Sequence, residues 1–278
     1  MGRPLVRFAR SVYDLLPRPV RVAAVAAMSR LMSRRRVTAT LDGVTFDLDL
    51  GEVIDVNLYL NNYEREVAAA IDRWTKPGMT VLDIGANIGA HALHLAKLVG
   101  PSGRVIAFEP TDFAFAKLKR NVALNPSLRV EPVKVALSDH TNSATGVDFR
   151  ASWRTDGSRR DGLSTVDFVR LDDWLAANGV ERIDLMKIDI DGHEYPMFAG
   201  GTATFARWRP RLLMEAVGPH FNDDARNPYR ILESLGYTFN ELKSGEPVTV
   251  EQMRDRLPRN ETDHISLSMN VLASPPQH

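Results

Sequence analysis

The residues of this chain whose types and spacing suggest chemistry begin with an acid, an amide and two glycines. Residues 81–89 read Val-Leu-Asp-Ile-Gly-Ala-Asn-Ile-Gly, an apolar run that ends in Asp83, Gly85, Asn87 and Gly89. Glycine lets a ligand approach the backbone closely, and the free N–H groups of a helix that follows point into the same space. The pattern predicts a nucleotide-binding turn at the carboxyl edge of a parallel sheet.

An acid at the end of the next apolar run extends this prediction. Glu109 lies about 20 residues beyond the glycine turn, where a carboxylate can accept hydrogen bonds from both hydroxyls of a ribose. The fingerprint of dinucleotide-binding proteins has a glycine at the position that Asn87 occupies here. The carboxylate of Asp83 would also repel the pyrophosphate of a dinucleotide, whereas it suits the ammonium of a methionine group. The residues therefore favour S-adenosylmethionine over NAD. An NAD-dependent oxidoreductase stays the first alternative, and a structural role for Asp83 in the turn is another.

A second polar cluster follows a later apolar run. Lys187 interrupts that run and needs a paired acid if it is buried. Asp189, Asp191, His193 and Glu194 follow it directly, and they are expected to face the cofactor pocket from the same sheet edge as Gly85 and Glu109.

Another apolar run carries Glu215, with His220 just beyond it. Two uses are open: Asp189, Asp191 and Glu215 could bind Mg²⁺, or one group could act as a general base. His193 is the first candidate base because its ordinary pKa is near neutrality, Asp191 is the second, and His220 is the next. Structural alternatives are that Glu194 caps its helix and that Glu215 pairs with Lys187.

The ordered set of motifs between Tyr63 and Leu242 resembles the FkbM family of S-adenosylmethionine-dependent methyltransferases. The motifs are Gly-Ala-Asn-Ile-Gly at 85–89, Ala-Phe-Glu-Pro at 107–110, Asn121 with Asn125, Val-Ala-Leu-Ser-Asp at 135–139, the segment 187–194, and Glu215. The resemblance implies methylation of a hydroxyl of a sugar, polysaccharide or secondary metabolite. One departure is Asp191, where glutamate is more usual in the family.

The resemblance also implies roles for single residues of the cofactor site. Asp83, Gly85, Asn87 and Gly89 would hold the methionine part, and Glu109 would hold the ribose. Ser138 and Asp139 would contact the adenine edge, and Tyr63 with Glu64 would close over the cofactor. These roles are expectations carried over from the family to the matching positions of this chain.

The elements expected to position these residues alternate between strand and helix. The apolar patterns predict seven strands, at 80–84, 104–108, 130–136, 183–189, 211–217, 236–242 and 266–272. Helices are expected at 52–75, 88–99, 113–124, 171–178, 194–207 and 224–235, and a hairpin at 37–50 around Asp42-Gly43. The fold class is therefore α/β, with a doubly wound seven-stranded sheet, and the family resemblance implies that this sheet is of the Rossmann-like class I methyltransferase type. Residues 140–161 and 243–264 are expected to be long surface loops.

Charge and composition give the remaining expectations. The chain is neutral overall, but residues 1–36 carry nine arginines against one aspartate. This arm could pack on the core, join two copies in a homo-oligomer, or touch an anionic membrane peripherally. We expect a basic arm and hairpin at 1–50 and a methyltransferase domain at 51–278. With no cysteine, the protein is expected to be cytoplasmic. A non-catalytic membrane- or nucleic-acid-binding protein is a weaker alternative, since no basic stripe continues beyond the arm.

Overall fold

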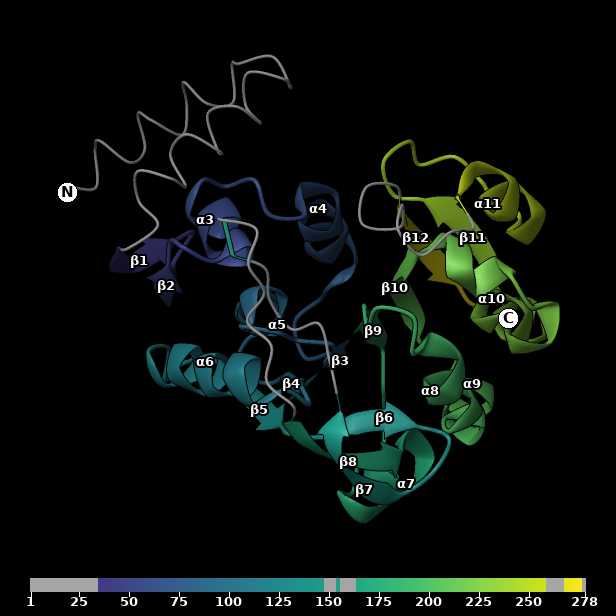
Figure 1. The fold of residues 1–278 in the computed structure, drawn as a ribbon, viewed down its shortest axis with the longest axis horizontal. Helices are drawn as coiled ribbons and strands as arrows, with labels where there is room; N and C mark the ends of the chain where they lie inside the picture. Colours follow the sequence, from purple (N-terminus) through teal and green to yellow (C-terminus); the bar gives the residue numbers. More distant parts are fainter. Residues whose placement is uncertain (1–34, 148–153, 156–163, 259–267, 277–278) are drawn as a thin grey trace.

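A seven-stranded sheet forms the centre of the molecule (Figure 1). The structure is a computed structural model, and it describes residues 35–147, 154–155, 164–258 and 268–276. The strand order is β11-β12-β10-β9-β3-β4-β5, with β12 antiparallel to both of its neighbours. The seven strands are those expected from the sequence: β3 (Thr80–Ile84), β4 (Arg104–Phe108), β5 (Val130–Val133), β9 (Leu185–Ile188), β10 (Arg211–Ala216), β11 (Thr238–Glu241) and β12 (Met269–Ser274).

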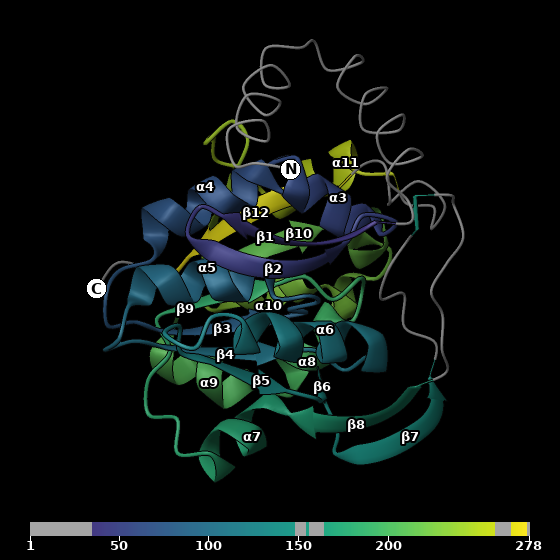
Figure 2. The ribbon, with the colours of Figure 1, turned by 90° about the vertical axis from the view of Figure 1, so that its left-hand side faces the viewer.

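Helices cover both faces of this sheet (Figure 2). One face packs against α4 (Arg65–Trp74), α5 (Ala90–Val99) and α6 (Asp112–Ala123). The other packs against α7 (Leu171–Ala177), α8 (Glu194–Ala199), α9 (Thr202–Trp208) and α10 (Pro228–Ser234). Successive strand residues serve opposite faces, so Val81 joins the first core and Leu82 the second. The doubly wound arrangement predicted from the sequence is confirmed.

The winding reverses next to β3, which places two turns side by side. Strand β4 pairs with one edge of β3 and β9 pairs with the other, both in parallel. The turn that follows β3 and the turn that follows β9 therefore leave the same edge of adjacent strands. In open α/β sheets, ligands bind in the crevice at such a reversal.

The expected hairpin at 37–50 is confirmed. It consists of β1 (Arg36–Leu41) and β2 (Val44–Asp49), and Asp42 and Gly43 form its turn with positive φ. Two amides of the α6 region bind its backbone: Asn121 Oδ1 accepts from Asp47 N and Asn125 Oδ1 from Thr45 N, both at 2.8 Å. The hairpin is thereby fixed against the sheet's helical layer.

Two predicted helices are each broken in the structure. The helix expected at 52–75 is instead α3 (Val53–Tyr59) followed by α4, because Asn61 and Glu64 adopt positive φ between them. The helix expected at 194–207 is α8 followed by α9. The chain passes so close to β6 there that a Cβ on Gly200 would lie 1.8 Å from the Ser138 carbonyl oxygen. Packing decides both breaks.

Both predicted surface loops contain regular structure. A second, three-stranded sheet with the order β6-β8-β7 is formed by β6 (Ala136–Ser138), β7 (Asn142–Val147) and β8 (Ser164–Arg170). Strand β7 lies in the first expected loop, and β8 was not predicted. Helix α11 (Val250–Arg256) lies in the second expected loop. Two short 3₁₀ helices, η1 (Gly218–Phe221) and η2 (Asp224–Arg226), follow β10 earlier in the chain. The prediction missed β7 because its residues alternate weakly and are mostly exposed.

Of the basic arm at 1–36, residues 1–34 lie outside the described residues, and Arg36 begins β1. Within the described part of the chain, no helix is both long enough and apolar enough to cross a bilayer.

Candidate functional site

The glycine turn that follows β3 lies directly against the end of β9. Gly85 has a φ of +81°, and a Cβ at this position would lie 1.8 Å from the carbonyl oxygen of Asp189. Gly85 N and Ala86 N both donate to the Phe108 carbonyl oxygen, and Asp189 N donates to Ile84 O at 3.1 Å. The sheet edge is thus packed backbone to backbone, and only glycine fits at position 85.

Asp83 is a fully buried acid without hydrogen bonds. Its exposed fraction is 0%, and within the described residues neither carboxylate oxygen has a hydrogen-bond partner. In the described part of the chain its one close cation is Lys187, whose Nζ is 3.6 Å from Asp83 Oδ1. A buried carboxylate in this condition is costly, because hydrogen bonds normally compensate for lost hydration. The turn therefore contains unused acceptor capacity beside Gly85.

Lys187 contacts both turns at this sheet edge, the one after β3 and the one after β9. Its Nζ donates to the Gly85 carbonyl oxygen at 3.1 Å and lies 3.3 Å from Asp189 Oδ2. Burial disfavours the ammonium, but the carboxylates of Asp189, Asp83 and Glu64 outweigh it and raise the pKa of Lys187 above its ordinary value. The acids that pair with Lys187 are therefore Asp83 and Asp189, and not Glu215.

Glu109 lies at the end of β4 and holds the same turn. Its Oε2 accepts from Asn87 N at 2.9 Å, and its Oε1 accepts from the Thr111 backbone N at 2.9 Å and hydroxyl at 2.5 Å. Burial raises the pKa of Glu109, although these three hydrogen bonds oppose the shift. Two carboxylate oxygens offer about four acceptor positions, so capacity for a ligand hydroxyl is left.

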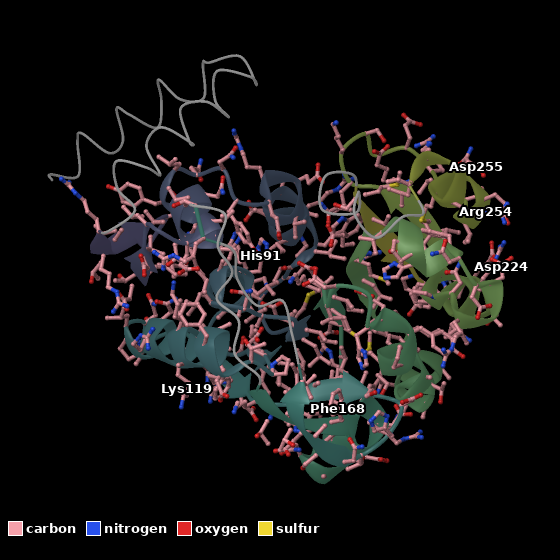
Figure 3. All side chains as sticks on the ribbon, in the orientation of Figure 1. His91, Lys119, Phe168, Asp224, Arg254 and Asp255 are labelled. Carbon is pink, nitrogen blue, oxygen red and sulfur yellow. The ribbon has the colours of Figure 1, made fainter. Side chains whose placement is uncertain are left out.

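Tyr63 and Glu64 reach the site from the break between α3 and α4. Glu64 Oε2 lies 2.6 Å from His91 Nε2 on α5, and the Tyr63 ring stacks on the His91 ring at 5.3 Å (His91 is labelled in Figure 3). Burial alone would raise the pKa of Glu64, but His91 and Lys187 lower it to about 2. This contact joins the chain before β3 to the helix that follows the glycine turn. The sequence offered no signal for His91, because a histidine on an apolar helix face is ordinary core.

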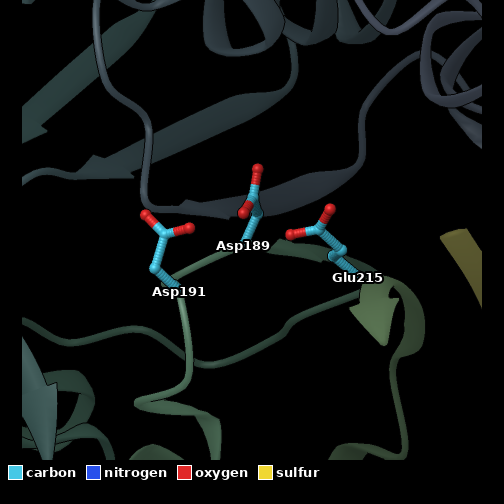
Figure 4. Close-up of side chains that lie close together, drawn as sticks. All are labelled: Asp189, Asp191 and Glu215. Carbon is cyan, nitrogen blue, oxygen red and sulfur yellow. The ribbon is translucent and has the colours of Figure 1, made fainter. Parts of the chain in front are cut away.

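Three acids gather where β9 and β10 end. Oxygens of Asp189, Asp191 and Glu215 all lie within 4.8 Å of one another (Figure 4). A small cavity beside them is lined by Glu64, Lys187, Asp189, Glu215 and Asn270, among other residues. Burial and the neighbouring Asp189 carboxylate raise the pKa of Glu215 to about 8. The three acids therefore lie together, as the sequence predicted. Glu215 can hold a proton near neutral pH.

His193 points toward the second sheet. Its Nε2 lies 3.2 Å from the hydroxyl of Ser138, which is fully buried at the end of β6. Asp139 Oδ1 lies 3.3 Å from that hydroxyl and 2.7 Å from His140 Nδ1. Burial lowers the pKa of His193, so the imidazole is neutral at neutral pH. Ser138 and His193, which the sequence placed in separate groups, are neighbours.

His220 and Glu194 form a buried pair instead of joining the open cluster. His220 Nε2 lies 2.6 Å from Glu194 Oε2, and both side chains are less than 5% exposed. His220 Nδ1 accepts from Val217 N at 3.4 Å, so both ring nitrogens have partners within the fold. His220, the third candidate base, is therefore occupied in holding η1 to α8. Glu194 also accepts from Ile190 N at 3.2 Å, just ahead of the helix that it opens.

Three comparisons with known proteins bear on this site. A family model described as a methyltransferase FkbM domain matches residues 83–239. The chain is 33% identical to the 2-O-methyltransferase NoeI of Sinorhizobium fredii over 156 residues, which cover 48% of this chain and 62% of that protein. It is 31% identical to the 31-O-demethyl-FK506 methyltransferase FkbM of Streptomyces tacrolimicus over 197 residues, 59% of this chain and 74% of that protein.

A solved structure, of a methyltransferase FkbM from Methylobacillus flagellatus KT, aligns with a TM-score of 0.45 at 15% identity. The alignment covers 91% of this chain and 59% of that one. The chain spans less than two thirds of the length of the first curated relatives that it matches.

Proposed function

The chain belongs to the FkbM methyltransferase family, since the family model spans residues 83–239 of 278, and we propose that it transfers a methyl group from S-adenosylmethionine to a hydroxyl of a sugar, polysaccharide or secondary metabolite. The names of the Sinorhizobium and Streptomyces relatives describe O-methyltransferases, one acting at a 2-O position and one at a 31-O position. The observation that carries the proposal is the buried, hydrogen-bond-free carboxylate of Asp83 beside the Gly85 turn.

The charges around the turn fit S-adenosylmethionine. The acids that act on Lys187 are Asp189, Asp83 and Glu64, so one ammonium stands against three carboxylates. A ligand with an ammonium and a sulfonium matches this excess of negative charge. The unused oxygens of Asp83 fit the ammonium. A pyrophosphate would meet the same carboxylates and be repelled, which supports this cofactor over NAD.

We assign the remaining cofactor contacts as the family resemblance implies. Gly85, Asn87 and Gly89 hold the methionine part with Asp83, and Glu109 binds the ribose with its remaining acceptor capacity. From its position beside Gly85, Asp189 is assigned to the cofactor site as well. Ser138 and Asp139 border the adenine, and Tyr63 with Glu64 covers the site. The ring stack and the 2.6 Å contact to His91 support the last role, because they fix this segment to the helix of the glycine turn.

The chemistry requires a proton acceptor and alignment. When bound, S-adenosylmethionine supplies a methyl group on a positively charged sulfur. The acceptor hydroxyl forms a bond to that carbon as the carbon–sulfur bond breaks, and the hydroxyl proton passes to a base. His193 is our base, because burial keeps its imidazole neutral at neutral pH. A positioned base typically contributes about 10²–10⁴-fold in rate, and alignment of the reactants contributes about 7–11 kcal/mol.

Asp191 and Glu215 are proposed to bind the acceptor hydroxyl on the side of the acid cluster. Glu215, whose pKa is raised to about 8, is the alternative base. Mg²⁺ held by Asp189, Asp191 and Glu215 is the alternative use of the cluster, and it would lower the pKa of a coordinated hydroxyl. Lys187 Nζ lies 3.3 Å from Asp189 Oδ2 and already neutralises one of these carboxylates. This ion pair favours binding of the acceptor hydroxyl by the cluster over binding of a metal ion.

The decisive experiment is incubation with labelled S-adenosylmethionine and a panel of sugars, oligosaccharides and polyketide alcohols, with and without EDTA. Label transfer to a hydroxyl supports the proposal. Calorimetry with S-adenosylhomocysteine and NAD provides the independent arm. Tighter binding of NAD would favour the oxidoreductase alternative, and no binding of either ligand would favour a non-catalytic binding protein. Loss of transfer with EDTA, restored by added Mg²⁺, would establish the metal use.

We propose that the arginine-rich arm 1–36 affects location or assembly, through anionic lipid or a second copy of the chain, and that it takes no part in the chemistry. Its high positive charge suits contact with anionic lipid. None of the site residues lies within it, which supports the absence of a chemical role. Binding of the full chain, and of a chain lacking 1–34, to vesicles with and without anionic lipid tests the membrane role. Light scattering of both proteins tests the homo-oligomer. The expectations of a cytoplasmic location, of no nucleic-acid partner, and of a boundary near residue 50 stay predictions.

A further inference from the structure

His193 is connected to Asp139 through the hydroxyl of Ser138. Its Nε2 lies 3.2 Å from Ser138 Oγ, and Ser138 Oγ lies 3.3 Å from Asp139 Oδ1. Ser138 is fully buried, whereas the Asp139 side chain is 49% exposed. A base, a hydroxyl and a carboxylate thus form a continuous chain between the start of α8 and the end of β6.

The partners determine where the protons lie in this chain. An ionised carboxylate only accepts, so His140 Nδ1 carries the proton in its 2.7 Å contact with Asp139. His140 Nδ1 is therefore a donor and cannot accept from Ser138. The serine proton goes to the charged Asp139, because a hydrogen bond to an ionised acceptor is the stronger one. The serine oxygen then accepts from His193, which must carry its proton on Nε2.

The surroundings restrict the His193 ring in this orientation. The Phe168 ring on β8 lies 6.0 Å from the His193 ring and is stacked at 5.4 Å on the His140 ring (Phe168 is labelled in Figure 3). The charged or titratable groups that act on His193 are Glu194, Asp139 and His140. Among the described residues, His193 Nδ1 has no hydrogen-bond partner. The lone pair of the neutral ring is thus on the nitrogen that the fold leaves open.

We propose that Ser138 and Asp139 are positioning residues that hold His193 in its Nε2-protonated form, so that Nδ1 accepts the proton of the methyl acceptor. This inference rests on the proposed function for the identity of the acceptor, but the proton position itself can be measured in the free protein. It gives Ser138 and Asp139 a role that contact with the adenine edge would not require.

The test is long-range ¹H–¹⁵N correlation NMR of the histidine rings in the full chain, near neutral pH. The chain has seven histidines, and His193→Gln identifies the signals of His193 by their loss. We expect the Nε2–H tautomer in the parent protein and a mixture of both tautomers in Ser138→Ala. Asp139→Asn, a change at a half-exposed side chain, should produce the same mixture. Ser143→Ala is the matched control, because Ser143 also donates to an aspartate of this small sheet, Asp167, but takes no part in the chain of contacts from His193 to Asp139.

Two results would overturn the proposal: an Nδ1–H tautomer in the parent, or an unchanged tautomer in both the Ser138 and Asp139 variants. On an acceptor found with the panel, Ser138→Ala should lower kcat about ten-fold, a part of the 10²–10⁴-fold that a base contributes, with the KM for that acceptor changed less than two-fold at saturating S-adenosylmethionine. A higher KM at constant kcat would likewise overturn it. Failure of the parent to bind S-adenosylhomocysteine would instead count against the proposed function, and the tautomer would still decide this inference.

Discussion

Replacement of Asp83 by asparagine should weaken cofactor binding without weakening the fold. The two side chains have nearly the same shape, but asparagine lacks the negative charge. A hydrogen bond to a charged group contributes about 1.5–3 kcal/mol, and about 1.4 kcal/mol is a ten-fold change in affinity. The Kd of Asp83→Asn for S-adenosylhomocysteine should therefore rise roughly 10- to 150-fold.

The stability of the free protein should respond differently. The Asp83 carboxylate has no hydrogen bonds to lose, and Lys187 keeps its contacts to Asp189 and to the Gly85 carbonyl oxygen. Neutralising a buried acid also removes part of its desolvation cost. We expect the free energy of unfolding to change by less than about 1 kcal/mol, or to increase. Opposite effects on binding and stability are typical of a group retained for a ligand.

Isothermal titration calorimetry and urea unfolding of the same preparation measure the two quantities. Asp184→Asn is a matched control, because Asp184 lies just before β9 and its carboxylate already binds Thr80 N and Arg182. Unchanged affinity in a folded Asp83→Asn protein would refute the assignment of the unused acceptor to the cofactor. A loss of about 3 kcal/mol or more in stability would refute it equally, since it would show that the Asp83–Lys187 pair is structural.

Three further predictions follow from the same contacts. Glu109→Gln should raise the Kd for S-adenosylhomocysteine at least ten-fold by calorimetry, since it replaces an acceptor by a donor at the ribose; equal affinity would contradict the ribose role. Gly85→Ala should lower the unfolding free energy by at least about 2 kcal/mol more than Gly179→Ala, because both have positive φ but only Gly85 faces a backbone oxygen at 1.8 Å. Glu194→Ala should cost about 3–5 kcal/mol near pH 7 by breaking a buried pair. Because His220 lowers the pKa of Glu194 below 4.5 despite burial, this stabilisation is complete above pH 4.5 and decreases as the pH falls through the lowered pKa. The difference between parent and variant in urea unfolding should therefore shrink in acid; a constant difference would refute the pairing.

Much of this architecture could be predicted from the residues in sequence order. Apolar runs identified all seven strands of the main sheet, and the doubly wound sheet predicted from them is confirmed. The signals were strong because strands buried on both faces are almost wholly apolar, and because Gly85 marks the turn without ambiguity. Lys187, alone in such a strand, required an acid partner on energetic grounds.

Tertiary contacts decided the rest. Helix propensity runs through residues 52–75, yet the chain breaks before α4, where Glu64 reaches His91 and Tyr63 stacks on that ring. Nothing local distinguishes His193 from His220, and only the fold buries one against Glu194 and brings the other to Ser138. The sequence determined which polar groups leave the sheet edge, because strand periodicity is local. Which of them become partners depends on contacts between residues far apart in the chain, and only the packed structure sets those distances.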